Sequence, residues 1–206
     1  MNILKKIQYN SPVILSYALL SLIVLGISSL TDGVSNILLF SVYRAPPTDP
    51  LTYVRVMGHV LGHAHLNHYF GNFLLILLIG PILEEKYGSV PLLVMMIITS
   101  IITGVIFLLV SSSTRLLGAS GIVFMLILLS SFVNLKRGRI PLTLILVIIA
   151  YIGREVVQGF TATASDNNNI SYLTHVIGGL CGAVLGFFIN KERMGREERA
   201  ASGSES

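Results

Sequence analysis

Six apolar stretches, each near the length that a helix needs to cross a bilayer, constrain this chain more than any other feature. A hydrocarbon core of about 30 Å takes about 20 helical residues, because each residue adds about 1.5 Å. The stretches are Pro12–Leu30, Tyr69–Leu83, Val90–Val110, Gly118–Val133, Ile140–Val157 and Tyr172–Ile189. They lack the alternating pattern of barrel strands, and backbone groups in lipid must be hydrogen-bonded within the segment. We therefore predict an all-α membrane protein, a bundle of six transmembrane helices.

The composition agrees with a bilayer as solvent and excludes several classes of protein. Hydrophobic residues make up 53% of the chain and charged residues 12%, about half the charged share of a soluble domain. The 14 Lys and Arg residues are spread along the chain without a basic block, so we expect no nucleic-acid partner. Cys181 is the only cysteine, which excludes an internal disulfide and a cysteine-rich metal site.

Charge distribution predicts the orientation in the membrane. With both termini inside, ten of the 14 Lys and Arg residues fall in inner segments, and the outer loops hold Arg44, Arg55, Arg115 and Arg154. We expect a multi-pass protein of the cell membrane with cytoplasmic termini and an uncleaved first span. Residues 1–190 would form the membrane domain, with a long first outer loop from Thr31 to about Asn67. Residues 191–206 would form a polar, disordered cytoplasmic tail.

Polar residues cluster where three of the predicted helices begin. In this topology the second, fourth and sixth helices all enter the membrane from the outside. The start of the second helix carries His68 and Asn72, the start of the fourth carries Ser120, and the start of the sixth carries His175. Polar side chains at membrane depth are costly and usually functional. The common depth of these residues predicts a site near the outer face.

The residue types in this cluster suit acyl transfer. A serine hydroxyl becomes a nucleophile when a base such as histidine takes its proton. Ser120 would lie in a first helical turn, where free N–H groups favour negative charge, and Gly118 and Gly121 would permit close approach. His68 and Asn72 are four residues apart on one helix face, and both can donate hydrogen bonds to an oxyanion.

Three motifs in this order resemble the rhomboid family of intramembrane serine proteases. Residues 63–72 fit H-x-x-x-x-H-x-x-x-N, "GASG" at 118–121 fits G-x-S-G, and residues 175–182 fit H-x-x-G-x-x-x-G. "EEKYGS" at 84–89 and Arg55 also stand where the family has similar residues. Val54 departs from the aromatic residue often found before that arginine.

The resemblance implies a Ser120–His175 catalytic dyad that cleaves peptide bonds in or near transmembrane segments of other proteins. It implies an oxyanion site formed by His68, Asn72 and the Ser120 backbone N–H, and a structural role for His63. Phe124 is a departure, because it stands where some members have a tyrosine that packs beneath the histidine; phenylalanine can stack there but cannot form a hydrogen bond. The glycines at 178, 182 and 186 would let the sixth helix approach the fourth closely. No metal or cofactor is implied, and the expected partners are lipid and transmembrane substrates.

Other readings remain open. A catalytically inactive rhomboid-like protein could bind client membrane helices, although it would not need all four polar residues of the cluster. A transporter is a weaker alternative, because no charged residue lies near the middle of a predicted span. A metal site at His59, His63, His65 and His68 is also disfavoured, because no carboxylate or cysteine accompanies these histidines. The oligomeric state is not predicted.

Overall fold

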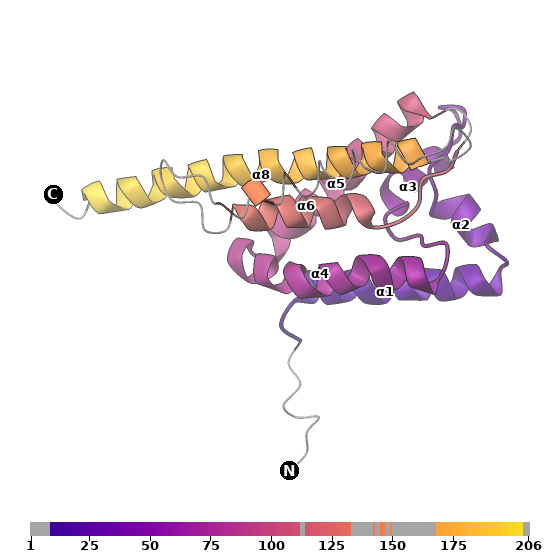
Figure 1. Cartoon of the computed structure of the whole chain (residues 1–206), viewed down its shortest axis with the longest axis horizontal. Coiled ribbons are helices and arrows are strands. Elements are labelled where there is room, and N and C mark those ends of the chain that lie inside the picture. The colour runs from indigo at the N-terminus through magenta and orange to yellow at the C-terminus, as the bar shows by residue number, and fades with distance from the viewer. Residues whose placement is uncertain are drawn as a thin grey trace, which may run out of the picture.

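The computed structural model describes residues 9–111, 114–132 and 168–203, together with the isolated positions 142, 145, 146 and 149. The helices in these ranges are α1 (Pro12–Leu30), α2 (Val34–Leu39), α3 (Leu51–Gly58), α4 (Leu66–Tyr87), α5 (Ser89–Val110), α6 (Ser120–Ser131) and α8 (Asn168–Gly203). Figure 1 shows α1 beside α4 and α6 beside α8. Most of the predicted fifth span, Ile140–Val157, lies outside the described residues.

Three of the described helices, α1, α4 and α5, are long and apolar enough to cross a membrane. α6 and the stretch Leu173–Ile189 within α8 are apolar but shorter. Within the described residues the fold is helical, apart from a single β-bridge between Val42 and Leu116. These observations confirm the predicted all-α membrane class, whereas the count of six spans stays a prediction.

The ends of the helices differ from the apolar stretches for local reasons. α4 begins three residues before the stretch Tyr69–Leu83 and ends at Tyr87, because the next residue, Gly88, has a φ of +91°. α6 is shorter than the stretch Gly118–Val133, because Gly118 has a φ of +127° and the helix starts only at Ser120. α8 continues through residues 191–203, where we expected a disordered tail. That segment is rich in Glu, Arg, Lys and Ala, which favour helix.

Glu84 joins the end of α4 to the beginning of α1. Its buried carboxylate accepts hydrogen bonds from the backbone N–H groups of Val13 and Ile14, each at 3.0 Å, and from Ser89 Oγ at 2.7 Å. The Ser11 side chain makes no capping bond. Glu84 therefore caps α1 from another helix and places its negative charge at the positive end of the α1 dipole.

Replacing Glu84 with glutamine should destabilise the protein by about 2 kcal/mol, because the amide loses the charge and offers one acceptor oxygen instead of two. Thermal unfolding in detergent measures this effect. Glu85→Gln is the matched control, because Glu85 is the next residue in the chain and its side chain is exposed. Equal unfolding temperatures for the two variants would show that the carboxylate does not stabilise the α1–α4 pair.

Arg55 connects several parts of the segment between α1 and α4. This buried side chain donates from Nε to Leu38 O at 2.9 Å and from Nη1 to Asp49 Oδ2 at 2.7 Å. Its guanidinium lies 4.5 Å from the centre of the Tyr43 ring. The hydrogen bond from Arg55 lowers the pKa of Asp49 below its usual value. Next to Tyr43, Val42 exchanges two backbone hydrogen bonds with Leu116, so the segment also holds the chain that leads to Ser120.

Glycines bring α8 into backbone contact with α6. A Cβ added at Gly178 would collide with the backbone of Gly121, and one added at Gly182 would collide with the backbone of Met125. One further turn along, a Cβ at Gly186 would lie 2.9 Å from the Phe132 ring. Small residues spaced four apart allow such an approach between membrane helices. This packing sets the position of His175, one turn before Gly178.

Candidate active site

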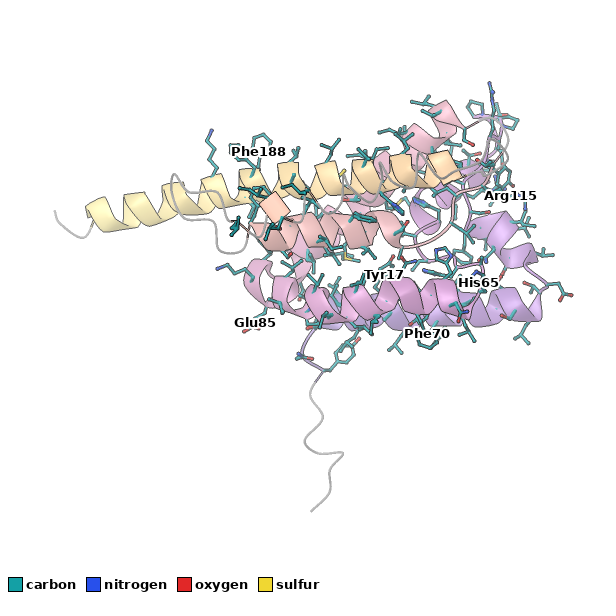
Figure 2. All side chains as sticks on the ribbon, viewed as in Figure 1. Tyr17, His65, Phe70, Glu85, Arg115 and Phe188 are labelled. Carbon is teal, nitrogen blue, oxygen red and sulfur yellow. The ribbon has the colours of Figure 1, made fainter. Side chains whose placement is uncertain are left out.

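The first turns of α4 and α6 and the early part of α8 meet at one end of the bundle. Figure 2 shows His65 and Arg115 at this end, and Glu85 and Phe188 at the opposite end. Ser120, His68 and His175 are all partly exposed, whereas Asn72 and His63 are buried. The residues that the sequence analysis proposed for the site therefore lie in the N-terminal parts of α4, α6 and α8, which meet at this end of the bundle.

Ser120 is the first residue of α6. Gly118 precedes it in a backbone conformation with a φ of +127°, which residues with a side chain rarely adopt. The Gly118 N–H donates to His59 O at 2.9 Å, and the first α6 bond runs from Val123 N to Ala119 O. The Ser120 N–H thus belongs to the group of helix-start N–H groups that have no partner within the helix.

His68 and Asn72 lie against this glycine turn. A Cβ added at Gly118 would lie 2.7 Å from both Cε1 and Nε2 of His68, and 3.8 Å from Nδ2 of Asn72. Glycine is therefore needed at 118 for space as well as for conformation. The two side chains come from successive turns of α4 and approach the segment two residues before Ser120.

His63 connects the two sides of the site. Its Nδ1 lies 3.2 Å from Leu61 O, and its Nε2 lies 3.2 Å from Asn72 Nδ2 and 3.4 Å from the Ala119 N that points to it. A carbonyl can only accept and an amide N–H can only donate, so the neutral tautomer with hydrogen on Nδ1 satisfies all three contacts. His63 in this form orients the Asn72 amide and holds the residue before Ser120.

His175 belongs to α8, and this part of α8 packs against α6. Its ring centre is 4.5 Å from that of Phe124, with an angle of 36° between the planes, and Phe124 is one turn after Ser120. The preceding residue, Thr174, has its Cγ2 3.3 Å from the position of a Cβ on Gly121. The helix packing thus places Thr174 against the first turn of α6 and the His175 ring against Phe124, one turn further along.

His59 supports the site in a way that the sequence analysis missed. Its ring is buried, with Nδ1 2.9 Å from Val56 O and Nε2 3.4 Å from Thr103 Oγ1, and its carbonyl accepts the Gly118 N–H. The spacing of four between His59 and His63 was the one available signal, and we considered it for metal binding. In the part of the chain that the structure describes, no three His, Cys, Asp or Glu side chains are arranged to hold a metal ion.

Stability should fall as the pH decreases from 6.5 to 4. Burial lowers the pKa of His59 and of His63 to about 4, with the nearby His68 adding to the effect at His63. Between these values the unfolded chain binds protons that the folded protein excludes, so protonation favours unfolding; above pH 6.5 the two histidines contribute no pH dependence. Unfolding temperatures in detergent across this range test the prediction. His59→Gln should give a shallower slope, and a flat wild-type profile would contradict the expectation.

This fold and site define a helical membrane protein with a polar site at one end of its bundle. The model of the Rhomboid domain matches residues 50–192, which is well over half of the chain. The chain belongs to the rhomboid family. A comparison with curated proteins finds no match. The matched range contains the residues of α4, α6 and α8 described above and excludes α1 and α2.

Proposed function

We propose that this protein is an intramembrane serine protease that cleaves peptide bonds in or near transmembrane segments of other membrane proteins. The observation that carries the proposal is the convergence of three helices around residues 118–121. α6 starts with Ser120, the His175 ring of α8 packs against Phe124 one turn further along α6, and α4 presents His68 and Asn72 to Gly118. Nucleophile, base and oxyanion donors are the parts that acyl transfer requires.

Each residue has a defined role in the proposed reaction. Ser120 Oγ attacks the scissile carbonyl carbon while His175 accepts the hydroxyl proton. The negative oxygen of the tetrahedral intermediate accepts hydrogen bonds from the Ser120 N–H and the side chains of His68 and Asn72. The C–N bond then breaks, and His175 gives its proton to the leaving amine. Water, deprotonated by His175, then attacks the acyl carbon. The bond between that carbon and Ser120 Oγ breaks, and His175 returns its proton to Oγ.

Neighbouring residues suit these roles. The Phe124 ring supports His175 on the side that faces α6, and His63 in its neutral form holds the Asn72 amide. Ser120, His68 and His175 are partly exposed, so none of them is sealed inside the protein, as attack by water on the acyl-enzyme requires. The reaction as proposed uses no metal or cofactor.

The proposed topology has six membrane crossings, cytoplasmic termini and a site just below the outer face. The excess of Lys and Arg in the inner segments supports this orientation. The Glu84 contact also supports it, because it puts the start of α1 at the end of the bundle that is remote from Ser120. The proposed partners are the lipid bilayer and transmembrane substrates. Because a helix shields its carbonyls, residues that weaken helix near the cut should favour cleavage.

The proposal is tested by incubating the purified protein in detergent with a panel of single-span substrates and with a fluorophosphonate probe. We expect specific cleavage products and a covalent adduct that mass spectrometry maps to Ser120. Substrate capture without cleavage or labelling would instead favour the non-catalytic binder of client helices. Labelling at a serine other than Ser120 would place the nucleophile elsewhere.

A further inference from the structure

Tyr17 belongs to α1, which lies outside the range that the Rhomboid domain matches, and the reaction proposed above does not use it. We infer that Tyr17 is a positioning residue: its hydroxyl holds the turn at residues 59–61, and through that turn it holds the oxyanion donors in place. The inference rests on the proposed function, because it concerns the geometry of the proposed oxyanion site.

A buried hydrogen bond joins Tyr17 to this turn. The Tyr17 hydroxyl donates to Val60 O at 2.8 Å, and both residues are buried. Among the described residues no other donor reaches this carbonyl. Figure 2 shows Tyr17 between the pair of helices α1 and α4 and the pair α6 and α8. The bond therefore connects the first helix of the bundle to the turn that precedes α4.

The carbonyl before that of Val60 holds the chain that leads to the nucleophile. His59 O accepts the Gly118 N–H at 2.9 Å, and Gly118 lies two residues before Ser120. The Ser120 N–H is one of the proposed oxyanion donors, and its direction depends on the backbone of this glycine turn. A displacement of the His59 carbonyl would therefore change the direction of that donor.

The carbonyl after that of Val60 acts on a second donor. Leu61 O lies 3.2 Å from Nδ1 of His63 and accepts its hydrogen in the neutral tautomer. Nε2 of the same ring lies 3.2 Å from Nδ2 of Asn72. Each contact orients the next group, so a displaced Leu61 carbonyl would turn the Asn72 amide. Tyr17 thus holds the middle one of three consecutive carbonyls, and the outer two contact the site.

The space beside the bond offers the Val60 carbonyl no replacement partner. A cavity of about 450 Å³ lies there, lined by Tyr17, Val60 and mainly apolar side chains of α1, α5 and α6. The other hydroxyls in its wall, those of Ser16 and Ser100, have hydrogen-bond partners of their own. An unpaired carbonyl is costly in apolar surroundings, so without the Tyr17 hydroxyl the turn should move until this carbonyl finds a donor.

Tyr69 provides a matched control for the loss of a tyrosine hydroxyl. It is also buried, and its hydroxyl donates to Ala18 O at 3.0 Å. That acceptor lies within α1, where the helix itself supplies a second donor, and it is not part of the turn. Tyr17→Phe keeps the ring that lies 5.1 Å from Phe73, and Tyr69→Phe keeps the ring that lies 5.6 Å from His63. Each variant therefore removes one buried hydrogen bond and little else.

The experiment measures kcat and KM of the wild type, Tyr17→Phe and Tyr69→Phe with a single-span substrate in detergent. Rates are expressed per folded protein, with the folded fraction taken from thermal unfolding in the same detergent. We expect kcat of Tyr17→Phe to fall about fivefold, the typical effect of one lost hydrogen bond, with KM unchanged. Tyr69→Phe should keep the wild-type kcat, whatever its unfolding temperature.

A double-mutant cycle with Asn72→Ala separates positioning from a general loss of stability. When the Asn72 amide is absent, its orientation no longer matters, so Tyr17→Phe should then lower kcat by about twofold or less. An equal loss in both backgrounds would overturn the inference, as would an unchanged kcat in Tyr17→Phe or an equal loss in Tyr69→Phe. A failure of the proposed function looks different, because the wild type itself would then cleave no substrate, and the inference would fall with it.

Discussion

Ser120→Ala should abolish cleavage of a single-span substrate, with a loss of at least about 10³-fold in kcat. The substitution removes the proposed nucleophile and leaves the N–H at the start of α6 in place. His175→Ala should cost about as much, because a nucleophile without its base is inactive. The double variant should be no slower than either single variant, since the two groups act as one unit. Initial rates of product formation, resolved by mass spectrometry, measure these losses.

Ser130→Ala is the matched control for Ser120→Ala. Ser130 lies on the same helix, is also partly exposed, and uses its hydroxyl to donate to Ile127 O at 2.7 Å. Its removal should leave kcat and KM unchanged. Undiminished cleavage by Ser120→Ala would reject the catalytic proposal, and a double variant much slower than both single variants would reject the paired roles of Ser120 and His175.

Gly178→Ala should destabilise the protein by about 1–3 kcal/mol and lower its activity. The added methyl group meets the backbone of Gly121, which cannot move aside as a flexible side chain could. α8 must therefore shift away from α6, and His175 must move with it. We expect a lower unfolding temperature in detergent together with a lower kcat in the fraction that remains folded.

Gly179→Ala is the control for this effect. A Cβ at Gly179 would lie 3.6 Å from Leu128 Cδ2, an ordinary van der Waals contact. This substitution should be neutral or slightly stabilising, since alanine favours helix over glycine. If Gly178→Ala and Gly179→Ala unfold at the same temperature, the close α6–α8 contact does not contribute to stability.

The sequence predicted the features that local patterns encode. The lengths of the apolar runs were sufficient to place α1, α4 and α5 within a few residues, because a lipid environment demands uninterrupted helix. The spacing of Gly178 and Gly182 anticipated the face of α8 that packs on α6. His68 and Asn72 were assigned to one face of a helix by their separation alone.

Contacts between distant segments left no such pattern. Nothing in the residues around Glu84 indicated that its carboxylate caps α1, because its partners are backbone N–H groups about 70 positions away. The bond from Gly118 N to His59 O and the bridge between Val42 and Leu116 are also backbone contacts. Residues of any type can form such bonds, so the sequence carries no signal for them. His65 was considered only for metal binding, and its role as the N-cap of α4 was not predicted, because histidine is rarely an N-cap.

Under the proposed function, the contact of Gly178 and Gly182 with the backbone of α6 limits how a substrate reaches the proposed site. Two helices that touch main chain to main chain have no side chains between them that could rearrange, so α6 and α8 should move together as one rigid body. Ser120 and His175 then keep their relative positions during motions of the rest of the protein. Any opening wide enough for a client helix must come from displacement of other parts of the bundle.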